Sequence, residues 1–149
     1  TLVPDVPGQL TSNHGWDTIT EMDYLKKIIA VFKAEGIRVS IFVDPIVDMV
    51  KAAADTGTDR VELYTEAYAS GFTNAKEKAI AAYIDAAEAA ATEGLGLNAG
   101  HDLDRNNLSY FAKHIPNLLE VSIGHALVAD ALYYGLENVV QMYKRALMV

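Results

Sequence analysis

The stretch NAGHD at residues 98–102 ends one apolar run of the chain and opens onto a polar loop. A second stretch, IGHA at residues 123–126, also ends an apolar run, and a helix-like segment follows it. Each stretch places a glycine directly before a histidine, where a buried strand would leave the core. Glycine lets the backbone approach an anion closely, a helix N-terminus offers unpaired N–H groups to a phosphate, and histidine moves protons near neutral pH. We therefore expect the two stretches to form one site, presented by the rest of the chain.

Composition limits the class of protein. The 149 residues fit one domain, 51% of them are hydrophobic, and the formal charge is −8. An acidic chain of this kind disfavours nucleic acid and anionic membranes as partners, so a phosphorylated ligand would have to be held by local groups. The absence of cysteine fits the cytoplasm. The sequence contains no dinucleotide fingerprint, P-loop, zinc-type spacing or membrane-length apolar run.

Strand-like and helix-like segments alternate along the chain. The expected strands are residues 38–44, 60–65, 94–98 and 120–123, preceded by a strand end at 1–5. The expected helices run from 18 to 35, from 45 to 56, from 74 to 93, from 104 to 115, from 126 to 134 and from 136 onward. Asp44 before Pro45 is typical of a helix start, with Asp44 as the cap. This alternation predicts an α/β fold with parallel strands joined by right-handed crossovers.

The details favour part of a TIM (β/α)₈ barrel. Polar residues gather where the expected strands end, which is where parallel α/β folds bind ligands, and a doubled helix follows the last strand. A complete barrel needs about 250 residues, whereas five strands are expected here. The chain also begins at Thr1 without a methionine. We therefore interpret residues 1–149 as one domain piece, the C-terminal half of a barrel carrying strands 4–8.

Four residues are the main candidates for chemistry. His101 is the best candidate for proton transfer, against the alternative of an ordinary loop histidine. Glu62 alternates with Val61 and Leu63, whose apolar side chains suit the helix-packed face, so Glu62 is expected on the inner face. A carboxylate there is costly unless it is paired, which favours a functional role over an ion pair with a nearby arginine. For His125, contact with a ligand and a plain role at the start of a helix are equally supported. For Thr11, contact with a substrate oxygen and an ordinary role in a loop turn are equally supported.

Four stretches together resemble a known family. They are VSIFVD at 39–44, VELYT at 61–65, LNAGHDL at 97–103 and IGHA at 123–126, with TLVPD at 1–5 resembling an earlier strand. In this order they are similar to consecutive strand ends of the pyridoxine 5′-phosphate synthase family. That resemblance implies a (β/α)₈ barrel assembled as an octamer. It also implies condensation of 1-deoxy-D-xylulose 5-phosphate with 3-amino-2-oxopropyl phosphate, releasing phosphate and water, without a metal or redox cofactor.

The resemblance also assigns roles by position. It implies that His101 is the proton donor and that Glu62 stabilises charge in the transition state. Thr11 would contact the deoxyxylulose phosphate, while Asp102, Gly124 and His125 would contact the aminoketone phosphate. Some members carry glycine at the position of Asp102, so its contact is assigned to the backbone. The residues alone indicate His101, Glu62 and the Gly124–His125 pair but not Asp102.

The resemblance further implies that the first strands of the barrel, with the proton acceptors, are missing from this chain. The isolated chain is then expected to be inactive, with the N-terminal half of the barrel as its partner. Two alternatives remain open. One is a metal-dependent sugar-phosphate epimerase on the same barrel type, using its histidines with Glu62 and Asp44 as ligands. The other is a non-catalytic half-barrel that binds a phosphorylated ligand.

Overall fold

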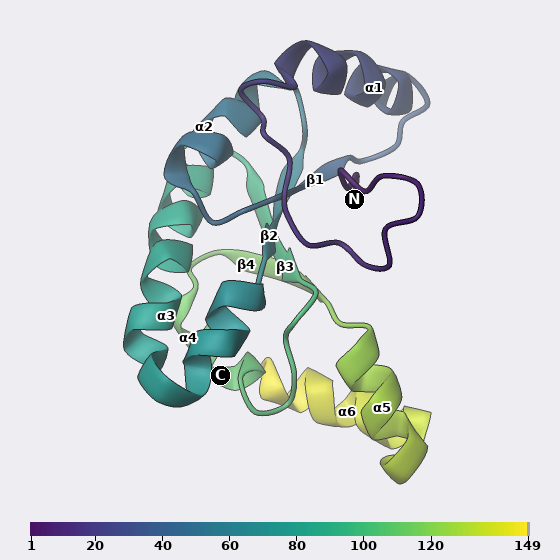
Figure 1. The fold of residues 1–149 in the computed structure, drawn as a ribbon, viewed down its shortest axis with the longest axis vertical. Coiled ribbons are helices and arrows are strands. Elements are labelled where there is room, and N and C mark those ends of the chain that lie inside the picture. The colour runs from purple at the N-terminus through teal and green to yellow at the C-terminus, as the bar shows by residue number, and fades with distance from the viewer. Residues whose placement is uncertain (149) are drawn as a thin grey trace.

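A four-stranded parallel sheet forms the centre of the computed structural model, which describes residues 1–148 (Figure 1). The strands are β1 (Ser40–Val43), β2 (Arg60–Tyr64), β3 (Gly96–Gly100) and β4 (Leu118–Ser122). They pair in chain order, β1-β2-β3-β4, and every pair is parallel. The expected α/β class and the four complete strands are therefore confirmed.

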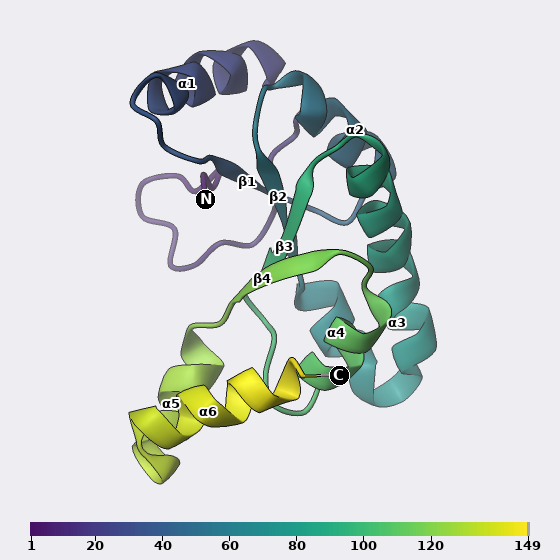
Figure 2. The same cartoon turned by 180° about the vertical axis from the view of Figure 1, so that it is seen from behind.

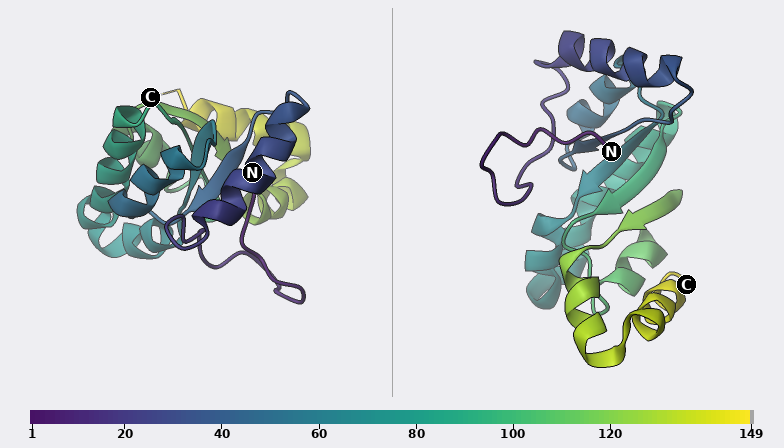
Figure 3. Two further views of the ribbon diagram at one scale, coloured as in Figure 1. Left: turned by 90° about the horizontal axis from the view of Figure 1, so that it is seen from above. Right: turned by 90° about the vertical axis from the view of Figure 1, so that its right-hand side faces the viewer.

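Six helices connect and follow these strands within the described residues. They are α1 (Met22–Ala34), α2 (Val47–Asp55), α3 (Glu66–Thr92), α4 (Leu108–His114), α5 (His125–Tyr134) and α6 (Leu136–Ala146). Each strand of this sheet lies next to the one before it in the chain, always on the same side. With right-handed crossovers, this order places all the connecting helices on one face of the sheet. Figures 1 and 2 show this arrangement, with α2, α3 and α4 on one side of the strands. The N-terminal loop lies on the other side and projects from the body of the molecule (Figure 3).

The two faces of the sheet differ in polarity. The helix-covered face is apolar and almost fully buried; its strand residues are Ile41, Val43, Val61, Leu63, Leu97 and Ala99. The opposite face carries Glu62 and Asn98, both buried, beside Gly100 and Ser122. Because strand side chains alternate between faces, this difference follows directly from the sequence of β2 and β3. The expected inward position of Glu62 is thus observed.

Some expected local features differ from the structure. The strand expected at residues 1–5 is reduced to a bridge, in which Leu2 pairs with Ile41 beside β1. Asp44 is not the cap of α2, so that prediction was wrong: the cap position is Ile46, and the Asp44 carboxylate accepts the Gly15 N–H at 3.1 Å. None of the helices in residues 1–148 is both long and apolar enough to cross a membrane.

Helix α3 is longer than the expected segment at 74–93. It begins at Glu66 and contains one residue with non-helical backbone angles, Ala75, where two helical pieces meet. The helix start expected at Asn74 lies one residue before this junction. The sequence-based prediction missed the first helical piece, residues 66–74, which follows β2 directly.

Asp59 supports the end of the sheet where the strands begin. Its carboxylate binds Lys33 Nζ at 2.8 Å and the Val39 N–H at 2.8 Å, joining α1 to the start of β1. The Lys33 hydrogen bond, followed by that from Val39, lowers the pKa of Asp59 below its ordinary value. The unfolded chain therefore takes up this proton first on acidification. The stabilisation is present above the unfolded pKa of about 4 and is lost as the pH falls through the lower folded pKa.

We expect Asp59→Asn to lower the free energy of unfolding at pH 7 by about 1 kcal/mol, a value reduced for partial exposure. The difference from the unmodified chain should shrink below about pH 4. Urea titrations at pH 7 and pH 3 measure both effects. Asp55→Asn is the matched control, since Asp55 is exposed at the end of α2. An equal loss in both variants, or a loss independent of pH, would contradict this role of Asp59.

Candidate functional site

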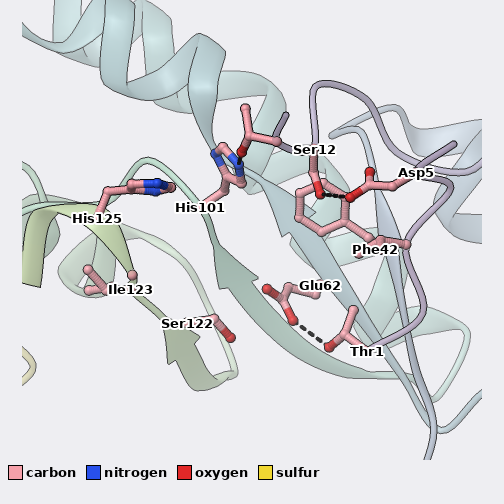
Figure 4. A pocket seen from close by; sticks show the side chains of 12 residues that line it. Thr1, Asp5, Ser12, Phe42, Glu62, His101, Ser122, Ile123 and His125 are labelled. Atoms are coloured by element: carbon pink, nitrogen blue, oxygen red, sulfur yellow. Dashed lines mark hydrogen bonds between the residues drawn. The ribbon is translucent and has the colours of Figure 1, made fainter. Parts of the chain in front are cut away.

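A cavity of about 500 Å³ lies on the polar face, at the carboxyl ends of the strands. Its lining comes from the N-terminal loop, from three strands and from the start of α5: Thr1, Val3, Asp5, Thr11, Ser12, Phe42, Glu62, His101, Ser122, Ile123, Gly124 and His125. Figure 4 shows the side chains of His101 and His125 approaching this space from neighbouring chain segments. The two glycine–histidine stretches therefore meet at one cavity, as the sequence predicts.

His101 lies at the centre of a short hydrogen-bonded chain. Its Nε2 is 2.8 Å from the Thr11 hydroxyl, and its Nδ1 is 2.7 Å from Oδ2 of Asp102. An ionised carboxylate only accepts hydrogen bonds, so Nδ1 carries a hydrogen and the Asp102 side chain fixes the orientation of the ring. Nε2, on the other side of the ring, is then the nitrogen that can exchange a proton with a ligand in the cavity.

The backbone of His101 adopts an unusual conformation. Its φ is +93°, a region that residues with a Cβ rarely occupy. The His101 N–H donates to the Ser122 carbonyl at 3.1 Å, which ties this turn to the end of β4. Such conformations persist where the surrounding structure imposes them, and they are concentrated at functional sites. The geometry supports a functional His101 over an ordinary loop histidine.

Two aromatic rings flank the imidazole. The Tyr64 ring meets His101 edge-on with centroids 5.3 Å apart, and the Phe42 ring lies 6.4 Å away. Burial, followed by the charges of Asp102, Glu66 and Asp44, raises the pKa of Tyr64 above its ordinary value. Tyr64 therefore stays a neutral phenol at physiological pH. Together the rings limit movement of His101 and shield one side of it from water.

Glu62 is buried beside the cavity without an arginine partner. Its Oε2 accepts a 2.6 Å hydrogen bond from the Thr1 hydroxyl, drawn in Figure 4. Within residues 1–148, the arginines that could have paired with it, Arg38 and Arg60, bind Glu120 instead, at 3.2 and 3.0 Å. The ion-pair alternative for Glu62 is therefore wrong. A buried carboxylate that lines a cavity, and whose charge is not balanced by a neighbouring cation, is a candidate for direct action on a ligand.

Gly100 allows Glu62 to occupy this position. A Cβ on Gly100 would collide with Glu62 Oε1 and would lie 2.9 Å from the Cβ of Ser122. We expect Gly100→Ala to destabilise the fold by about 1–3 kcal/mol through overpacking and to displace the carboxylate. Gly124→Ala is the matched stability control, because nothing lies within 4 Å of its Cβ position and its φ is −104°. Urea unfolding of both variants provides the measurement. Equal stability losses would contradict the steric role of Gly100.

Gly124 and His125 begin helix α5. Gly124 occupies the cap position and His125 is the first helical residue of a ten-residue helix. Both are exposed and both line the cavity. The free N–H groups and positive end of the helix dipole at this point suit an anionic group such as phosphate. The imidazole of His125 adds a further hydrogen-bonding group at the same end.

Asp102 lies behind His101 and outside the cavity lining. Its N–H donates to the Thr65 hydroxyl at 3.0 Å, and its carbonyl accepts from the Asn107 side chain at 3.3 Å. Both backbone groups that the family resemblance implied for ligand contact therefore have partners within the chain. What the structure shows for Asp102 is contact with the His101 ring. A substrate contact by Asp102 stays a prediction.

Sequence reasoning assigned no role in the site to Phe42 or Thr65. The alternation in VSIFVD could have placed Phe42 on the inner face, opposite Ile41 and Val43. Thr65 was noted as a polar residue at a strand end, but its contacts could not be predicted, since its hydroxyl bonds to residues more than thirty positions away. Among residues 1–148, no three histidine, aspartate, glutamate or cysteine side chains come close enough to hold a metal ion. The described residues therefore give the epimerase alternative no support from an assembled ligand set.

Comparison with known proteins gives a consistent result. Residues 1–149 match the family model described as "Pyridoxal phosphate biosynthesis protein PdxJ". Three relatives named pyridoxine 5′-phosphate synthase each align with 99% of this chain. The protein from Cytophaga hutchinsonii is 63% identical to the chain, that from Flavobacterium johnsoniae 55% and that from Bacteroides fragilis 54%. The chain spans 62% of the length of each of these relatives.

Proposed function

The chain belongs to the pyridoxal phosphate biosynthesis protein PdxJ family, and we propose that it is the larger, C-terminal part of a pyridoxine 5′-phosphate synthase. The observation that carries the proposal is the position of His101, held between Thr11 and Asp102 at a cavity that also contains Glu62 and the start of α5. The proposed enzyme condenses 1-deoxy-D-xylulose 5-phosphate with 3-amino-2-oxopropyl phosphate, and it releases phosphate and water.

We further propose that the sheet is half of a (β/α)₈ barrel. The strands follow one another in chain order with helices on one face, which is the arrangement of a barrel rather than of a doubly wound sheet. The share of the relatives' length that this chain does not span, 38% by difference from the 62% matched, suits the strands needed to close the barrel. These strands would supply the proton acceptors and cover the open side of the cavity.

The residues fit the steps of such a condensation. Joining an amine to a ketone requires a proton for the departing oxygen. The protonated form of His101 donates it from Nε2, the atom that contacts the Thr11 hydroxyl beside the cavity, while Nδ1–H stays bound to Asp102. The nitrogen gains positive charge as that oxygen leaves, and the buried Glu62 carboxylate stabilises such charge. Gly124 and His125 at the start of α5 bind the phosphate of the aminoketone, while Thr11 contacts the deoxyxylulose phosphate. These local groups offset the repulsion expected from a net charge of −8.

A chimera tests this function in cells. It joins the N-terminal part of the Cytophaga enzyme, the part that this chain is proposed to lack, to Thr1 of the chain. We expect the chimera to restore growth without added pyridoxine to a bacterium that lacks its own synthase gene. The chain alone should fail to do so. Failure of a stably expressed chimera, with the Cytophaga enzyme succeeding in parallel, would argue against the proposal and for a non-catalytic half-barrel. The homo-oligomer and the cytoplasmic location remain predictions.

A further inference from the structure

Thr65 connects the end of β2 to the turn that carries His101. Its side chain is fully buried, and its hydroxyl donates to the Gly100 carbonyl at 2.7 Å. The same hydroxyl oxygen accepts the Asp102 N–H at 3.0 Å. The Thr65 N–H also donates to the Gly100 carbonyl, at 3.2 Å. One hydroxyl thus binds the backbone on both sides of His101.

This use of the hydroxyl is unusual for its position. Thr65 is the cap residue of α3, where a threonine side chain ordinarily accepts an N–H from the first turn of the helix. In the described structure the Thr65 side chain makes no such capping bond. Its hydrogen-bonding capacity is directed to the His101 turn instead. A helix-stabilising role therefore does not account for this threonine.

The turn needs external support because of its conformation. His101 has a φ of +93°, which is unfavourable for a residue with a Cβ and persists only where neighbours impose it. The Ser122 carbonyl holds the His101 N–H from the β4 side. Thr65 holds Gly100 and Asp102 from the β2 side. Between them, these contacts fix the direction in which the imidazole leaves the backbone.

We propose that Thr65 is a positioning residue for His101, whose hydroxyl holds the turn at residues 100–102 so that the imidazole reaches both Thr11 and the Asp102 carboxylate. The catalytic part of this inference rests on the proposed synthase function, whereas the structural part does not. Loss of the hydroxyl leaves the part-buried Asp102 N–H without its acceptor, which costs free energy and allows the turn to change shape. Small displacements of a catalytic group can reduce the rate about 100-fold.

Two substitutions separate the hydroxyl from the shape of the side chain. Thr65→Val keeps the shape and removes the hydroxyl, while Thr65→Ser keeps the hydroxyl and removes the methyl group. In the chimera, we expect Thr65→Val to lower kcat about 10- to 100-fold with KM changed less than about threefold. Thr65→Ser should restore kcat to within about threefold of the unmodified chimera. Thr65→Ala, which makes fewer demands on packing, provides a second hydroxyl-free variant.

Hydrogen exchange provides a readout that does not depend on turnover. In the 149-residue chain, we expect Thr65→Val to lower the protection factor of the Asp102 amide at least about tenfold. Thr65→Ser should leave that protection factor unchanged. If the chimera proves inactive as a synthase but this difference is found, the proposed function fails while the positioning of the turn stands. Unchanged Asp102 protection in Thr65→Val would overturn the inference. So would equal kcat losses in the Val and Ser variants, or unfolding of both hydroxyl-free variants while Thr65→Ser folds.

Discussion

Replacing His101 with alanine is expected to lower kcat of the chimera by a factor of about 10²–10⁴, the range typical of losing a general acid. In the described structure the His101 imidazole joins Thr11 and Asp102, and its loss removes the Nε2 atom from the cavity. The loss should not come from unfolding. Removing the ring leaves the backbone bond to Ser122 available, and His101→Gly should relieve the cost of the positive φ.

Steady-state kinetics and urea unfolding of the same samples separate these effects. We expect His101→Gly to be at least as stable as His101→Ala and equally inactive. His114→Ala is the control, because His114 is exposed on α4 and its ring bonds to the Tyr110 carbonyl, away from the cavity. Activity of His101→Ala within about threefold of the unmodified chimera would rule out His101 as the proton donor.

We expect that replacing Glu62 with glutamine lowers kcat about 10²- to 10³-fold. This is the typical cost of losing one preorganised electrostatic contact. The amide keeps the size of the side chain, and its oxygen can still accept the Thr1 hydroxyl. What disappears is the negative charge beside the cavity. The effect should therefore fall on kcat more than on KM, and the free energy of unfolding should not decrease.

Glu66→Gln is the matched control for Glu62→Gln. Glu66 is the first residue of α3 and its side chain is exposed. Its carboxylate accepts a hydrogen bond from the Ser70 hydroxyl and does not line the cavity. We expect its kcat to stay within about twofold of the unmodified chimera. A loss confined to KM in Glu62→Gln would assign Glu62 to substrate binding alone. Full activity of Glu62→Gln would exclude a charge-stabilising role.

Much of the fold and part of the site follow from local sequence patterns. Alternation in VELYT placed Glu62 on the inner face because the side chains of a strand must point to opposite sides. The two glycine–histidine stretches were predicted to meet because the carboxyl ends of parallel strands lie at one edge of a sheet. These inferences needed only the period of a strand and the direction of the chain.

The features that the sequence did not reveal depend on contacts between distant residues. Thr11 lies 90 positions from the histidine that it binds, and no pattern in the N-terminal loop indicates that contact. The wrong prediction for Asp44 has a similar cause: a local rule assigned its carboxylate to α2, but Gly15 from the N-terminal loop competes for it. The positive φ of His101 was likewise invisible, because the bonds that impose it come from Thr65 and Ser122.

The most direct test of the central claim is an in vitro assay of the purified chimera for pyridoxine 5′-phosphate, with both proposed substrates supplied. We expect product formation by the chimera, none by the 149-residue chain alone, and a rate about 10²–10⁴-fold lower from the chimera carrying His101→Ala. A folded chimera that forms no product under conditions in which the Cytophaga enzyme is active would contradict the proposed synthase function. Undiminished product formation by the His101→Ala chimera would contradict the assignment of His101 as the proton donor.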